Sequence, residues 1–132
     1  MLDFLRILVA LMLVMHGAAH ILWFLASWTS VPTGVSNGPW ILPGDVTIKS
    51  TIGRILGLLA LIVMVVFVFA AVMLVAGLAN WRSVANIGVF LSYGAVVPWL
   101  RQAPGGWGLT SVGANIVLMF LLALPVSVEL SA

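Results

Sequence analysis

Charged residues and cysteine are what this sequence has least of. Of its 132 residues only 6% are charged, whereas a typical soluble domain has about 25%. So few charges cannot cover a folded chain of this length in water, and we expect lipid to be the solvent for most of it. The lack of cysteine excludes disulfides, thiolate metal sites and cysteine nucleophiles.

Groups for catalysis and for nucleic-acid binding are scarce as well. The five basic residues are spread along the chain and form no basic patch, so we expect no nucleic-acid partner. The three acidic residues form no pair for general acid–base chemistry, and no Ser/His/Asp set or phosphate-binding loop can be assembled. We therefore predict no catalytic residue, and the sequence does not favour an enzyme.

Long hydrophobic runs are what the sequence does have, with 64% hydrophobic residues. A helix needs roughly 20 residues to cross a bilayer core about 30 Å thick. Such runs predict spans at about residues 4–28, 54–78, 83–100 and 108–128. The first exceeds the roughly 7–15 apolar residues of a signal peptide, so we expect a transmembrane helix. The prediction is one all-α domain over residues 1–132, an integral membrane four-helix bundle with both termini on the same side.

The connection at residues 29–53 is long and contains three prolines and four glycines. It is too interrupted for a helix, and it has room for a short strand or hairpin over the mouth of the bundle. Arg54 follows it, placed to snorkel, to pair with Asp45 or to meet an anionic lipid or ligand. Five tryptophans gather at this end of the spans and suggest an interfacial belt: Trp23, Trp28, Trp40, Trp99 and Trp107.

Two histidines in the first span are the leading functional candidates. Met12, His16 and His20 follow one another at intervals of four, so they form one stripe along a helix. Ionisable residues at membrane depth are costly and are functional hypotheses by default. One alternative is structural, because polar side chains also hydrogen-bond across helices simply to hold them together. Another is proton transfer, because histidine changes its charge near neutral pH.

Other polar residues fall at a similar depth. Counted from the end with the long loop, His20, Ser92 and Tyr93, and Asn115 share one layer. We predict His16, His20, Tyr93 and Asn115 as cofactor-binding residues. Such a layer suits a polar head group, the carbonyl of a quinone, or a metal.

The sequence narrows the cofactor without choosing one. Two histidines four apart on one helix cannot be trans axial ligands of one haem, and there are no others. One histidine could ligate a haem or a chlorophyll-type pigment. Copper is also open, with Met12, His16 and His20 as candidate ligands, since thioether and imidazole suit Cu(I).

Small residues at intervals of four suggest close helix packing. Gly53 and Gly57, and Gly88 and Ser92, form two such faces. With the small size and scarce catalytic groups, they favour a non-catalytic accessory or assembly subunit that packs against other membrane subunits or itself, in a redox or photosynthetic complex. The alternative is a binding module that holds a quinone, haem, pigment or copper through His16 and His20.

Two segments carry a family resemblance. One is His16-Gly17-Ala18-Ala19-His20, and the other is Gly108-Leu109-Thr110-Ser111-Val112-Gly113-Ala114-Asn115. They resemble the H-G-x-x-H and F-G-T-x-x-N-like segments of small DoxX-like four-helix bacterial membrane proteins.

The resemblance implies a four-helix bundle in the bacterial cytoplasmic membrane, and a possible role as an oxidoreductase component, since some members are linked to quinone-dependent redox complexes. It carries over His16, Gly17, His20 and Asn115. The sequence departs from the family at Pro104-Gly105-Gly106, where relatives often have acidic and basic residues.

Overall fold

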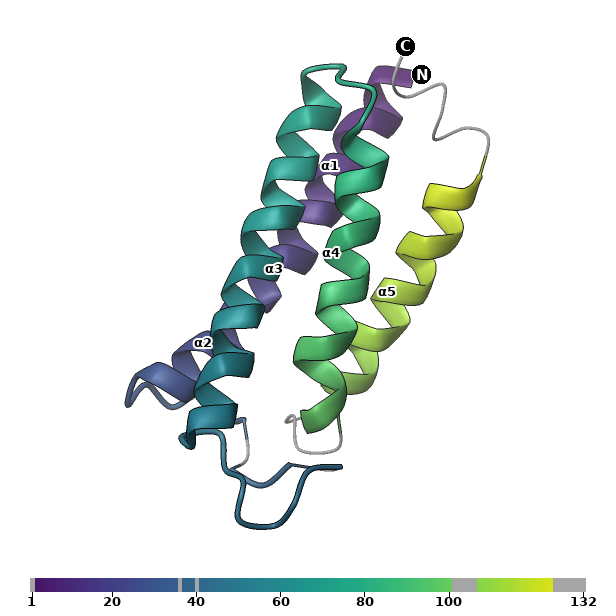
Figure 1. Cartoon of the computed structure of the whole chain (residues 1–132). Helices are drawn as coiled ribbons and strands as arrows, with labels where there is room; N and C mark the ends of the chain where they lie inside the picture. The colour runs from purple at the N-terminus through teal and green to yellow at the C-terminus, as the bar shows by residue number, and fades with distance from the viewer. Residues whose placement is uncertain (1, 36, 40, 101–106, 125–132) are drawn as a thin grey trace.

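The computed structural model describes residues 2–35, 37–39, 41–100 and 107–124 (Figure 1). Its helices are α1 (Leu2–Ala19), α2 (Ile21–Trp28), α3 (Thr51–Val75), α4 (Trp81–Val96), the 3₁₀ turn η1 (Val97–Trp99) and α5 (Trp107–Ala123). Because α2 follows α1 across one bend and η1 continues α4, the chain makes four helical segments. The described residues contain no strand, so the all-α expectation is confirmed there, and 29–53 holds no hairpin in its described part.

Two of the four segments have the length and composition to cross a membrane. They are Asp3–Trp28, with 26 residues, and Thr51–Val75, with 25 residues. The last segment is apolar but shorter, at Gly108–Ala123, and α4 has 16 residues. Residues 125–128, which we expected to extend the last span, lie outside the described residues.

The ends of α3 follow from local chemistry. Ser50 caps its start, because the Ser50 hydroxyl accepts the Gly53 N–H at 3.2 Å. At the other end Gly77 has φ of +71°, and the N–H of Leu78 donates to the carbonyl of Met73. This is a Schellman ending, which needs a left-handed residue and therefore favours glycine. The tight turn lets α4 begin at Trp81, beside α3.

The helices pack in the order α1, α3, α4, α5. Among the described residues α3 contacts α1, α2 and α4, whereas α5 packs mainly on α4 and shares few contacts with α1. Arg82 fastens α5 to α4 by donating to the Leu122 carbonyl. The start of α1 and the end of α5 lie at the same end of the molecule (Figure 1).

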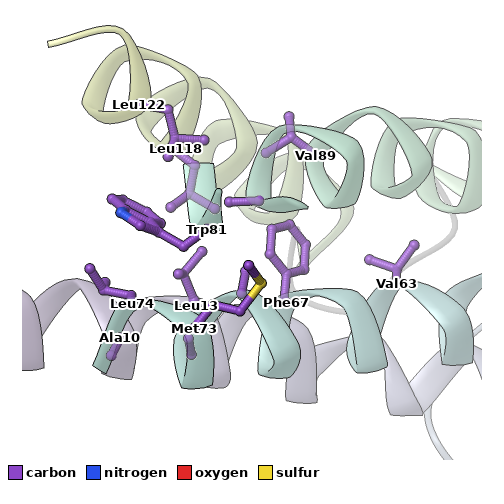
Figure 2. Packing of buried hydrophobic residues seen from close by; sticks show 13 residues of the cluster. Ala10, Leu13, Val63, Phe67, Met73, Leu74, Trp81, Val89, Leu118 and Leu122 are labelled. Carbon is purple, nitrogen blue, oxygen red and sulfur yellow. The ribbon is translucent and has the colours of Figure 1, made fainter. Parts of the chain in front are cut away.

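One hydrophobic cluster joins all four segments. Leu13 of α1, Phe67 of α3, Trp81 of α4 and Leu118 of α5 are buried in it (Figure 2). A second cluster lies toward the long loop, where Val46 and Ile48 contribute to it. Two loop residues thus close one end of the interior.

The tryptophan belt is wrong for most of its described members. Trp23 and Trp99 are buried in the second cluster, and Trp81 at the other end is buried as well. Among the tryptophan side chains that the structure describes, only Trp28 is exposed, with 46% of its surface accessible. Trp40 and the side chain of Trp107 lie outside the described part. Most of these rings are therefore core residues, because large aromatic side chains fill the wide ends of the helix packing.

The small residues are also used inside the chain. A Cβ on Gly57 would lie 1.8 Å from the Ser27 hydroxyl oxygen of α2, and one on Gly88 would lie 3.1 Å from the Phe67 ring. Gly53 and Ser92 are buried too. These small-residue faces are covered within the chain, Gly53 by the loop at Thr47 and Ile48 and Gly57 and Gly88 by neighbouring helices, so the partner prediction gains no support from them.

Candidate functional site

The site begins at the bend between α1 and α2. The N–H of His20 lies 3.0 Å from the carbonyl of Gly17, an i to i−3 contact that tightens the last turn of α1. The His20 ring donates from Nδ1 to the carbonyl of His16 at 2.9 Å. A side chain that bonds into the helix ladder is a recognised cause of bending. The bend turns α2 toward the start of α3, where Gly57 accommodates Ser27.

Four side chains from three helices form one hydrogen-bonded set, which we call the histidine network: His16, His20, Ser92 and Asn115. The His16 Nε2 and Asn115 Oδ1 atoms are 2.8 Å apart. The Asn115 amide donates to the Ser92 hydroxyl at 2.8 Å, and that oxygen lies 2.7 Å from His20 Nε2. The network therefore links α1 to α5, α5 to α4, and α4 to the bend between α1 and α2.

These contacts assign both imidazole tautomers. His20 donates from Nδ1 to a carbonyl, so its Nε2 accepts the Ser92 hydroxyl proton. Asn115 presents its oxygen to His16, so His16 donates from Nε2. Every member is satisfied with both rings neutral. Of the four imidazole nitrogens, only His16 Nδ1 then has no hydrogen-bond partner among the described residues.

The network lies in an apolar setting. His20, Ser92 and Asn115 are buried, whereas His16 is half-buried. The Phe67 ring packs edge-on against His16, with centroids 5.0 Å apart, and near His20 at 6.2 Å. Gly17 permits this approach, because a Cβ there would lie 2.9 Å from the Phe67 Cβ. Hydrogen bonds surrounded by apolar groups do not compete with water, so the network fixes the positions of the helices relative to one another.

Most of the predicted site residues come together, with one correction. His16, His20 and Asn115 meet directly. Tyr93 does not join them, because its hydroxyl donates to the Met119 sulfur at 3.8 Å on the α4–α5 side. Its neighbour Ser92 takes the expected place. Residues adjacent on a helix point about 100° apart, so only one of the two can face the histidines.

Of the candidate metal- and cofactor-binding histidine atoms, the structure leaves one nitrogen free to bind a ligand. Both His20 nitrogens are engaged, so a metal or haem bound there would have to displace Ser92. Met12 is partly buried and forms no hydrogen bond within the described chain. Among the described residues no three His, Cys, Asp or Glu side chains are grouped to hold a metal. His16 Nδ1 is the one imidazole atom that can accept a ligand as the structure stands.

Two buried polar atoms were missed by the sequence reading. Trp23 Nε1 and the Ser111 hydroxyl are buried without a partner in the described structure. Trp23 lies one turn beyond His20, and Ser111 one turn before Asn115, so both are on the loop side of the network. Ser111 has a sequence signal, because it is four residues from Asn115 on the same helical face. The tryptophan has none.

No protein-family model, curated protein or solved structure matches this chain in the comparisons made.

Proposed function

We propose that this chain is an integral membrane protein whose four helical segments form a bundle in the bilayer, with both termini on one side. The support is the surface. Large apolar side chains are exposed on every long helix, including Ile7, Leu11, Ile55, Ile62, Phe69, Ile87, Phe90, Ile116 and Phe120. The described charged residues lie at or near helix ends or in the loop: Asp3, Arg6, Asp45, Lys49, Arg54 and Arg82. In water this surface would drive aggregation, whereas in lipid it is matched to its solvent.

Within that setting we propose an accessory or assembly subunit of a larger membrane complex, redox or photosynthetic in kind. The observation that carries this is an open groove of about 450 Å³ between α1 and α3, lined by aliphatic side chains that include Ala10, Val14, Ala71, Val72, Val75 and Ala76. Alanines in its lining allow a second backbone to come close, which favours a neighbouring transmembrane helix. The histidine network supports a non-catalytic role, because its side chains bond to one another and leave few groups free for catalysis.

The test is co-purification from the native membrane in mild detergent. Val72 lines the groove and is 59% exposed, so Val72→Phe should fill the groove without entering the core. Val117 on α5 is 50% exposed and lies outside the groove, so Val117→Phe is the matched control. We expect stoichiometric partner bands with the parent chain and the control, and their loss with Val72→Phe. A chain that purifies alone in all three cases would refute the proposal.

The second candidate is a binding module for a quinone, haem, pigment or copper, now centred on His16. The lone pair of His16 Nδ1 favours it. The test is the absorption spectrum of the purified protein, compared between His16→Leu and His20→Leu. A chromophore lost in the first variant and retained in the second supports the module. A parent protein that is colourless and is shown by mass spectrometry to carry neither a metal nor a quinone removes it.

The DoxX-like resemblance enters as part of the same proposal. The residues that it carries over from its two segments, His16, His20 and Asn115, belong to one network, which supports reading the segments as one unit. It would place the chain in the bacterial cytoplasmic membrane. An oxidoreductase role of this type requires substrate-dependent quinone reduction in intact membranes. Equal rates of quinone reduction in membranes with and without the chain would refute it.

A further inference from the structure

The long loop folds into a polar pocket at one end of the molecule. This pocket of about 280 Å³, which we call the Lys49 pocket, is lined by Thr29, Ser30, Thr33, Asn37, Ile48 and Lys49 among others. The loop is held in shape by its own bonds. The Ile48 N–H donates to the Asn37 carbonyl at 3.1 Å, and the Lys49 ammonium donates to the Thr29 carbonyl. The pocket is thus built by residues from both ends of the loop.

The Lys49 pocket offers several free hydrogen-bond donors. Lys49 has three N–H donors and uses one on Thr29, which leaves two. The Thr33 hydroxyl accepts the Val35 N–H at 3.3 Å and keeps its own proton. Ser30 and the Asn37 side-chain amide have no partner in the part of the chain that the structure describes. Lys49 is the one charged residue in its lining, and no carboxylate lines it.

The Lys49 pocket also lies where a bilayer surface is expected. Thr29 directly follows Trp28, whose indole N–H donates to the Arg54 carbonyl at 3.0 Å. The Arg54 guanidinium lies 5.6 Å from the centre of the Trp28 ring. An exposed tryptophan with a basic residue beside it is typical of the membrane interface. The expected pair between Arg54 and Asp45 is not formed in the described structure, so both cations remain at this end without a bound acid.

We propose that the Lys49 pocket binds a phosphate-type anion, presented either as the head group of an anionic lipid or as a free phosphate. An ammonium with neighbouring hydroxyl and amide donors is the set that proteins use for phosphate oxygens. The pocket volume is slightly below the range of about 300 Å³ upward typical of small-molecule sites, which fits a head group. The proposal does not depend on the accessory role.

The sequence offers a direct assay, because Lys49 is its only lysine. The full chain in a neutral maltoside micelle is treated with an amine-acetylating reagent, and acetylation of Lys49 is followed by peptide mass spectrometry beside a reference lysine peptide. Three probes are added separately: dioctanoyl phosphatidylglycerol, dioctanoyl phosphatidylcholine and inorganic phosphate. A probe at about ten times its dissociation constant should slow acetylation about tenfold.

Each outcome decides the proposal. Slowing by phosphatidylglycerol alone supports a lipid head group, and slowing by inorganic phosphate as well supports a free anion. Equal rates with all three probes and without any would overturn the proposal. Ser30→Ala and Thr33→Val should reduce the protection without changing charge. Arg54→Gln removes one positive charge from the same end but outside the pocket lining, so protection should persist. If Arg54→Gln abolished the protection while Ser30→Ala and Thr33→Val had no effect, the protection would come from general charge attraction, and the pocket proposal would be overturned.

Discussion

Replacing Asn115 by leucine isolates the contribution of the histidine network to stability. Asn115 is fully buried and makes two interhelical hydrogen bonds, one to His16 and one to Ser92. Such bonds contribute about 0.6 kcal/mol on average in membrane proteins, and up to about 1.7 kcal/mol. Leucine is of similar size, so packing is largely kept. Two lost bonds, with the His16 N–H left unpaired, should lower the free energy of unfolding by about 1–3 kcal/mol.

The assay is unfolding in mixed micelles as the fraction of denaturing detergent rises, followed by tryptophan fluorescence. Asn86→Leu is the matched control, because Asn86 is a half-buried amide on α4 that makes no side-chain hydrogen bond within the described residues. Its change should stay within about 0.5 kcal/mol. A double-mutant cycle with His16→Leu should give a coupling energy of about 0.5 kcal/mol or more. If Asn115→Leu unfolds like Asn86→Leu and the coupling is zero, the network does not stabilise the fold.

Three further substitutions test the packing, all by the same unfolding assay. Gly57→Ala should destabilise the chain, because overpacking costs about 1–3 kcal/mol and outweighs the gain of up to about 1 kcal/mol in helix propensity. Adding Ser27→Gly should recover part of this loss, and no recovery would show that the added methyl group clashes with another residue. Phe67→Ala should cost about 3–5 kcal/mol because Phe67 is fully buried, whereas Ile62→Ala, at a position 52% exposed, should cost far less in a detergent micelle. Gly77→Ala should destabilise because φ is +71° there, whereas Gly113→Ala, in open space within α5, should stabilise by up to about 1 kcal/mol; equal effects would contradict the assigned helix ending.

The sequence predicted the helices because its apolar runs are long and its breaks are rich in proline, glycine and asparagine. The expected layer of His20, Ser92 and Asn115 was also predictable, since helix rise converts residue counts into depth. Depth does not specify direction around a helix. For that reason Tyr93 was chosen although Ser92 faces the histidines.

Other features depend on contacts that a sequence does not contain. Gly57 and Gly88 were recognised as packing positions, but whether a small residue receives a helix of the same chain or of a partner depends on the bend at His20 and on the turn after α3. Trp23 and Trp99 were assigned to the correct end but to the wrong surroundings, because an apolar ring suits both a core and an interface. The Lys49 pocket depends on the hydrogen bond between the Ile48 N–H and the Asn37 carbonyl, and no local sequence pattern predicts that bond.

The packing order of the helices has a consequence for biosynthesis. As the chain emerges from the ribosome, α1, α3 and α4 can assemble in sequence, and His20 can already pair with Ser92. The His16 N–H lacks its partner until α5 brings Asn115. In a bilayer, a chain without α5 would therefore leave one polar group unpaired in lipid, at a free-energy cost that Asn115 removes.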